Sequence, residues 1–112
     1  MSNVTKWQVI TDPMQLRRMG KTTEELGELI EAVGRMVSVV GRITIQGIDE
    51  IDPSSGKTNR LRLEEEIADV YAQLDENISR LGLRDDLIQS RRQVKRGYMQ
   101  EWEQMYVEDE PT

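Results

Sequence analysis

The 112-residue chain contains no cysteine and no histidine. Without cysteine, neither disulfide bonds nor thiolate metal sites can form. Without histidine, zinc sites built on imidazole and Ser-His or Cys-His nucleophile pairs are excluded as well. Any catalytic chemistry must therefore use carboxylates, lysine, arginine, tyrosine or metal-bound water.

Long apolar runs are also missing. No stretch approaches the ~20 apolar residues of a membrane span, and the first residues, MSNVTKWQVITDP, lack the apolar core of a signal peptide. The 21 acidic residues outnumber the 15 basic ones, which argues against the basic surface that coats nucleic acid. We therefore expect a cytoplasmic protein, one domain over residues 1–112, with neither a membrane nor a nucleic acid as partner.

The sequence predicts an all-α fold of three helices. Asp12 and Pro13 form a helix start, with Asp as the N-cap and Pro in the first helical position. Gly82 is placed to end the second helix, and Gly20 is a position where the first could break. The expected helices span about 13–42, 61–81 and 84–106.

The remaining segments are an N-terminal arm, an inter-helix connection and an acidic tail, at residues 1–11, 43–60 and 107–112. The first half of the connection, ITIQGIDE, alternates as a short strand does. Its second half carries turn residues and offers Thr58 or Asn59 as a helix cap. Gly56-Lys57-Thr58 resembles the end of a phosphate-binding loop, but Ile51 stands where that motif requires glycine.

Two acidic pairs are the most informative feature of the chain. Glu25 and Glu28 lie three residues apart in the first helix, and Glu66 and Asp69 do so in the second. Residues with this spacing are neighbours on a helix surface. Four carboxylates from two helices suit a hard cation such as Mg²⁺, which prefers oxygen ligands.

A helical wheel places both pairs at the edge of an apolar face. Lys21 shares the edge of Glu25 and Glu28, while Gln73 and Asn77 continue that of Glu66 and Asp69. If the helices pack through their apolar faces, the acidic edges converge on one groove. The two faces consist of Leu26, Leu29, Ile30, Val33, Met36, Val37 and Val40, and of Leu63, Ile67, Val70, Tyr71, Leu74, Ile78 and Leu81. Glu24, Glu31, Glu64 and Glu65 point away from them and are expected at the surface.

Three further side chains are open to two interpretations each. Arg91 and Lys95 lie one turn apart in the third helix, where they could contact phosphate or balance the acidic groove. Alternatively, their long stems cover apolar surface while their charges stay in water. Trp7 could stack on a base, or it could pack in a core or an interface.

Glycine recurs every seven residues along the first helix, at Gly20, Gly27, Gly34 and Gly41. Each glycine inside a helix costs about 0.8–1.0 kcal/mol relative to alanine. The repetition suggests a close approach by another helix, from the same chain or from a partner subunit. Alternatively, Gly20 and Gly41 only mark helix ends.

The acidic pattern, Glu24-Glu25-x-x-Glu28 followed by Glu66-x-x-Asp69, resembles the signature of the MazG-like all-α nucleoside triphosphate pyrophosphohydrolases. The resemblance covers roughly residues 15–100 and extends to the connection, which is similar to that of small stand-alone MazG-like proteins of phages and bacteria. It implies a helical bundle of antiparallel helices completed by oligomerisation, as a homodimer or homotetramer. It also implies Mg²⁺, or Mn²⁺ in its place, held by Glu25, Glu28, Glu66 and Asp69.

The activity implied is hydrolysis of a nucleoside triphosphate between its α- and β-phosphates, giving a monophosphate and pyrophosphate. The four carboxylates would be catalytic, and the substrate contacts would come from Lys21, Gln73, Asn77, Arg91, Lys95 and Trp7. The competing hypothesis is a non-catalytic helical interaction protein, in which the acidic edges hold a structural cation or dock a basic partner.

Overall fold

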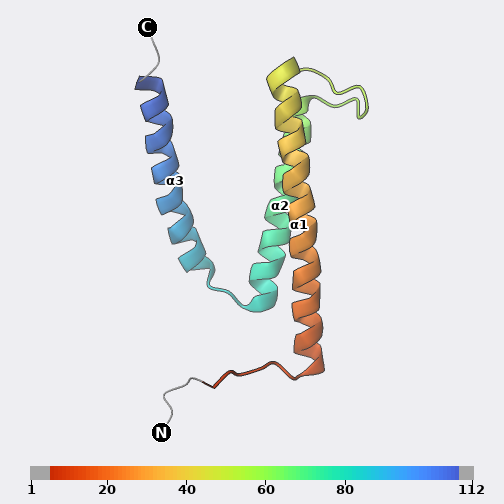
Figure 1. The fold of residues 1–112 in the computed structure, drawn as a ribbon, viewed down its shortest axis with the longest axis vertical. Coiled ribbons are helices and arrows are strands. Elements are labelled where there is room, and N and C mark those ends of the chain that lie inside the picture. The colour runs from red at the N-terminus through yellow and green to blue at the C-terminus, as the bar shows by residue number, and fades with distance from the viewer. Residues whose placement is uncertain (1–5, 109–112) are drawn as a thin grey trace. The chain divides into compact units, whose positions relative to one another are not determined.

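A computed structural model of the protein describes residues 6–108 (Figure 1). It contains three α-helices, α1 (Pro13–Gln46), α2 (Asn59–Leu81) and α3 (Asp85–Glu108), and no strand within the described range. The fold is therefore all-α, as predicted. No helix in this range is long and apolar enough to cross a membrane. The chain divides into two compact units, residues 1–80 with α1 and nearly all of α2, and residues 81–112 with α3.

Three predicted helix ends are confirmed: the starts of α1 and α2 and the end of α2. The carboxylate of Asp12 accepts a hydrogen bond from the backbone N–H of Gln15 at 3.0 Å, and Pro13 follows it. The hydroxyl of Thr58 accepts from the N–H of Leu61 at 3.1 Å and so caps α2. Gly82 has a φ of 62°, which only glycine adopts without strain, and it ends α2.

The first helix is longer than predicted. It runs unbroken through Gly20 and continues to Gln46, so the short strand expected in the first half of the connection is wrong. The hydroxyl of Thr44 donates to the carbonyl of Val40 one turn earlier, and Ile43 is half-buried. Packing thus outweighs the strand preference of these β-branched residues. Gly47, with a φ of 101°, ends the helix.

The connection between α1 and α2 is built around Asp52, whose side chain is 0% exposed. Its carboxylate accepts hydrogen bonds from the guanidinium groups of Arg42 and Arg62, one from each helix. The hydroxyls of Ser54 and Ser55 donate to it as well. These contacts tie the connection to the end of α1 and the beginning of α2.

The two helices of the first unit pair through only part of the predicted apolar faces. Leu29 and Met36 of α1 are half-buried, as are Leu63, Ile67, Val70 and Ile78 of α2, but the rest of both faces is exposed. The more buried positions of α1 alternate by three and four residues, which is the spacing of a coiled-coil seam. They are Thr22, Glu25, Leu29, Ala32, Met36, Val39 and Ile43. The apolar stripe beside this seam remains exposed, with Ile30 at 73% and Val37 at 67%. It consists of Leu26, Ile30, Val33, Val37 and Val40.

Within the first unit, α2 does not lie close to the repeated glycines of α1. A Cβ atom added at Gly20, Gly27, Gly34 or Gly41 would meet no other heavy atom within 4 Å. The close approach of a helix from within the chain is therefore not found among the described residues. A partner subunit remains the alternative that the sequence left open.

Candidate functional site

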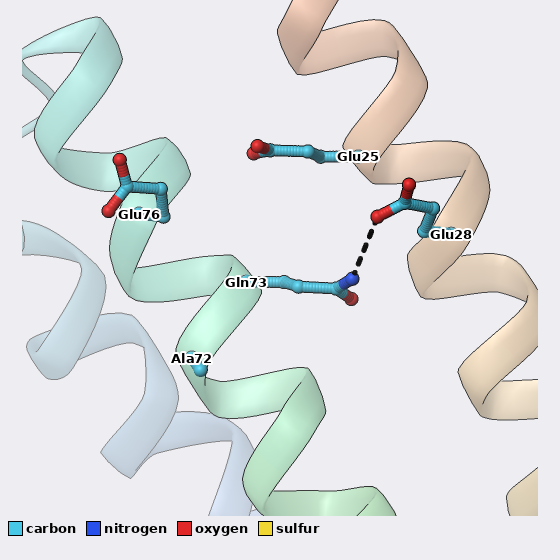
Figure 2. Close-up of a pocket in the computed structure, with 5 residues that line it drawn as sticks. All are labelled: Glu25, Glu28, Ala72, Gln73 and Glu76. Carbon is cyan, nitrogen blue, oxygen red and sulfur yellow. Dashed lines mark hydrogen bonds between the residues drawn. The ribbon is translucent and has the colours of Figure 1, made fainter.

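The candidate site is a pocket of about 180 Å³ between α1 and α2. It is lined by Glu25 and Glu28 from α1 and by Ala72, Gln73 and Glu76 from α2. Figure 2 shows Glu25 and Gln73 extending across the gap from opposite helices. The side-chain amide of Gln73 donates to Glu28 at 3.4 Å. One of the two predicted acidic pairs therefore lies at this pocket, beside a residue predicted to bind substrate.

Arg80 neutralises Glu25 at one end of the pocket. Its guanidinium donates two hydrogen bonds to the Glu25 carboxylate, at 2.6 and 3.0 Å, and its side chain is only 15% exposed. The hydrogen bond from Arg80 lowers the pKa of Glu25 below its ordinary value, by more than partial burial raises it. The same contact raises the pKa of Arg80. In this arrangement the charge of Glu25 is already balanced by a guanidinium.

Two buried amide groups beside the pocket have polar atoms without hydrogen-bond partners. Asn77 is 6% exposed; its oxygen accepts from Arg80 at 3.1 Å, but its amide nitrogen has no partner. The side-chain oxygen of Gln73 is likewise buried and unsatisfied. Buried polar atoms are usually paired, so these two are candidates for hydrogen bonds to a ligand or a water molecule.

The second acidic pair lies farther along the hairpin. Glu66 accepts two hydrogen bonds from the Nε of Arg35, both at 3.1 Å, and Asp69 is exposed. Glu28 faces Gln73, which follows Glu66 by seven residues. Seven residues of helix span about 10 Å, so the two acidic pairs are offset along the hairpin by about that distance.

The predicted metal ligands are therefore not gathered in one place. Within residues 6–108, no group of three or more acidic side chains lies close enough to hold a metal ion. The donors are of the right kind for Mg²⁺, since all are carboxylate oxygens. Their arrangement does not fit a single ion, because Glu25 and Glu66 are each paired with an arginine.

The other predicted substrate contacts are scattered. Lys21 is exposed and lies 3.6 Å from Glu24. Trp7 is 89% exposed, so it does not belong to the core of this chain. Arg91 and Lys95 are exposed residues of α3, in the second unit, and the ammonium group of Lys95 lies 5.9 Å from the centre of the Trp102 ring. Their roles toward a substrate remain predictions.

Sequence reasoning missed three residues of this region: Arg35, Glu76 and Arg80. Arg80 follows Asn77 by three residues and Gln73 by seven, so the predicted polar edge of α2 already led to it. Arg35 follows Glu28 by seven residues and therefore shares its face of α1. Glu24, Glu31, Glu64 and Glu65 are all exposed, as predicted.

No protein-family model, curated protein sequence or solved structure matches the chain.

Proposed function

We propose that this protein is a Mg²⁺-dependent nucleoside triphosphate pyrophosphohydrolase. The observation that carries the proposal is the pocket where Glu25 and Glu28 meet Gln73, with Arg80 alongside. Carboxylates suit a divalent cation, and a guanidinium suits phosphate oxygens. The order and spacing of the four carboxylates, Glu25, Glu28, Glu66 and Asp69, add the resemblance to the MazG-like enzymes.

In the proposed reaction, water adds to a phosphorus of the α–β anhydride and releases a monophosphate and pyrophosphate. The Arg80 guanidinium and the Lys21 ammonium are the nearby cations that could hold the negatively charged triphosphate. Gln73, which lines the pocket, and Asn77, which contacts Arg80, each have an unsatisfied amide atom that could bind the sugar or the base. Mg²⁺, or Mn²⁺, would offset the charge of the triphosphate when bound. The resemblance assigns it to Glu25, Glu28, Glu66 and Asp69, which do not share one ion in the described residues.

The direct test is incubation with each of the four NTPs and four dNTPs in the presence of Mg²⁺. We expect equal amounts of monophosphate and pyrophosphate from at least one nucleotide, and no product when EDTA removes the metal. Release of inorganic phosphate instead would place the cleavage at another bond. No turnover of any nucleotide, across a range of Mg²⁺ and Mn²⁺ concentrations, would exclude the enzyme.

The alternative, a non-catalytic interaction protein, is favoured by one observation. Glu25 and Glu66 are already neutralised by Arg80 and Arg35, as in a purely structural helical hairpin. The nucleotide panel distinguishes the two functions, since an interaction protein would hydrolyse none of the eight.

We also propose that the active form is a homodimer or homotetramer. The exposed apolar stripe of α1 is the surface we expect a second copy to cover, because contiguous apolar patches of this kind often mark protein–protein interfaces. Contact with a partner along this stripe would also account for the glycines beside it, at Gly27, Gly34 and Gly41.

Charge placed on the stripe is expected to separate the subunits. Ile30→Glu and Val37→Glu alter its two most exposed residues, so neither change creates a buried charge within the isolated chain. By light scattering, we expect the unaltered protein at a multiple of 13.0 kDa and the double variant at that mass. Ile45→Glu, at an 86% exposed residue outside the stripe, is the control and should leave the mass unchanged. A monomeric unaltered protein would contradict the proposal.

A further inference from the structure

One face of α3 has no partner helix within its own unit. In the described part of residues 81–112, α3 is the only helix, and Leu87, Val94 and Met105 are exposed by 55%, 50% and 53%. Helices in proteins owe most of their stability to the packing of one apolar face. A partner surface is therefore expected to cover this face.

The residues of this face have the spacing of a coiled coil. They alternate by four and three positions along the helix, as residues that contact a second helix do. All of them are exposed, and the two charged ones, Arg91 and Glu101, form no ion pair within residues 6–108. We call this face the α3 seam; it consists of Leu87, Arg91, Val94, Tyr98, Glu101 and Met105.

The α3 seam is complementary to itself in an antiparallel pair of helices. With Arg96 of both copies at the centre of the pair, residues equally far before and after Arg96 face each other. Apolar residues of the seam then face apolar residues, and each arginine faces a glutamate. The facing pairs, each formed twice, are Leu87–Met105, Arg91–Glu101 and Val94–Tyr98.

Other arrangements leave these charges unbalanced. In a parallel pair Arg91 would face Arg91 and Glu101 would face Glu101, because equivalent residues of a parallel coiled coil lie level. The exposed stripe of α1 is apolar throughout, so α3 docked on it would bury both charges without a partner, which is costly. The charges therefore favour a second α3 as the occupant of this face.

We propose that α3 binds α3 of a second copy, antiparallel, through the α3 seam. The Arg91 guanidinium of each copy donates hydrogen bonds to the Glu101 carboxylate of the other, which sets the orientation and the level of the two helices. The apolar pairs of the seam supply affinity, because they remove apolar surface from water. The pairing needs neither nucleotide nor metal.

Such a pair is weak by itself, because desolvation offsets most of the energy of its ion pairs. The pairing therefore rests on the homo-oligomer proposed above, in which the α1 stripe holds copies together and raises the effective concentration of their α3 helices. Loss of the stripe contact in the Ile30→Glu, Val37→Glu variant then still leaves a monomer.

Disulfide cross-linking of the full-length chain tests the antiparallel pair, since the chain has no cysteine of its own. We expect a variant with Leu87→Cys and Met105→Cys to form a disulfide-linked dimer under mild oxidation. The two positions lie about 27 Å apart along one helix, so they cannot link within a chain. Denaturing electrophoresis without reductant measures the dimer, and peptide mass spectrometry identifies the link between positions 87 and 105.

Three control variants test the orientation and the face. Leu87→Cys alone and Met105→Cys alone should remain unlinked, because only a parallel pair brings identical positions together. Gln89→Cys with Glu103→Cys places the cysteines at matching levels but on the opposite face of α3, so this variant should also remain unlinked. A dimer from either single variant, or none from Leu87→Cys with Met105→Cys, would overturn the proposal.

Exchanging the two charges tests the ion pair directly. In the Leu87→Cys, Met105→Cys background, Arg91→Glu or Glu101→Arg should each slow dimer formation by about tenfold or more, because like charges then face one another. Arg91→Glu with Glu101→Arg should restore the rate. The two residues lie about 15 Å apart along one helix, so restoration requires contact between copies.

Arg96→Glu is the matched control for the charge exchange. Arg96 is exposed and lies on the opposite face of α3, so its replacement should leave the rate of dimer formation unchanged. Circular dichroism verifies that the helices persist in every variant. If the doubly exchanged variant stays as slow as the single ones, Arg91 and Glu101 do not face each other and the antiparallel pair is wrong.

The α3 pair and the earlier proposals can fail separately. If the α1 stripe variant dissociates an oligomer that never links through positions 87 and 105, the stripe contact stands and the α3 pair falls. If the link forms and the protein hydrolyses no nucleotide, the α3 pair stands and the enzymatic function falls.

Discussion

Replacing Asp52 by asparagine is expected to lower the midpoint of thermal unfolding by about 10 °C or more. The Asp52 carboxylate is inaccessible to solvent and accepts hydrogen bonds from Arg42, Arg62, Ser54 and Ser55. An asparagine amide has one acceptor oxygen and no charge, so it leaves two guanidinium groups without their carboxylate. Circular dichroism during heating measures the change. Asp49→Asn, at an exposed ion pair with Arg60, is the matched control and should shift the midpoint little.

The stability due to Asp52 should also depend on pH. Burial raises the pKa of Asp52, but hydrogen bonds from Ser54, Arg62 and Ser55 outweigh it and hold the pKa well below its ordinary value. Because the pKa is lower in the folded state, the contribution is complete above about pH 5 and is lost as the pH falls. Without histidine, few groups titrate between about pH 5 and 9, so the urea midpoint should stay nearly constant there. Asp52→Asn should show a weaker decline in acid than the unaltered protein, and an equal decline would contradict this assignment.

The second large effect is expected on catalysis. Glu66→Gln and Asp69→Asn should each lower turnover of the best nucleotide by at least about 100-fold, because each removes a charged oxygen ligand from the proposed metal site. The helices should persist, since Asp69 is exposed and the Arg35–Glu66 pair is partly exposed. Steady-state kinetics across a range of Mg²⁺ concentrations provides the measurement.

Neighbouring glutamates supply the controls for this prediction. Glu64→Gln and Glu65→Gln change the same residue type on the same turns of α2, but both side chains are exposed. Their turnover should stay within about twofold of the unaltered protein. Undiminished turnover in both Glu66→Gln and Asp69→Asn would remove α2 from the metal site and leave Glu25 and Glu28 as its remaining candidates.

The spacing of residues in the sequence predicted much of the site. The wheel placed Glu25, Glu28, Gln73 and Asn77 on edges that do meet, and Glu25, Glu28 and Gln73 line or contact one pocket. Counting residues from the connection also indicates how far along the α1–α2 pair Glu66 lies. Glu28 lies 18 residues before the end of α1, whereas Glu66 lies 7 residues after the start of α2. Unequal distances from a turn place two residues at different levels of an antiparallel hairpin.

The sequence by itself determined the three helices and three of their ends, because caps and glycines act through contacts within a few residues. These ends are set by Asp12 with Gln15, by Thr58 with Leu61, and by Gly82 through its positive φ. It also predicted that Glu24, Glu31, Glu64 and Glu65 are exposed, but not that Glu28 is exposed as well. Only the tertiary structure decided which face of α1 contacts α2 and which residues of the two helices lie opposite one another. The contact with α2 is made by the seam residues that include Ala32 and Val39, and not by the apolar stripe. Arg35 lies opposite Glu66. Helical periodicity fixes the direction of a side chain around its own axis, but its height along a partner depends on where the chain turns and on contacts between residues far apart in sequence.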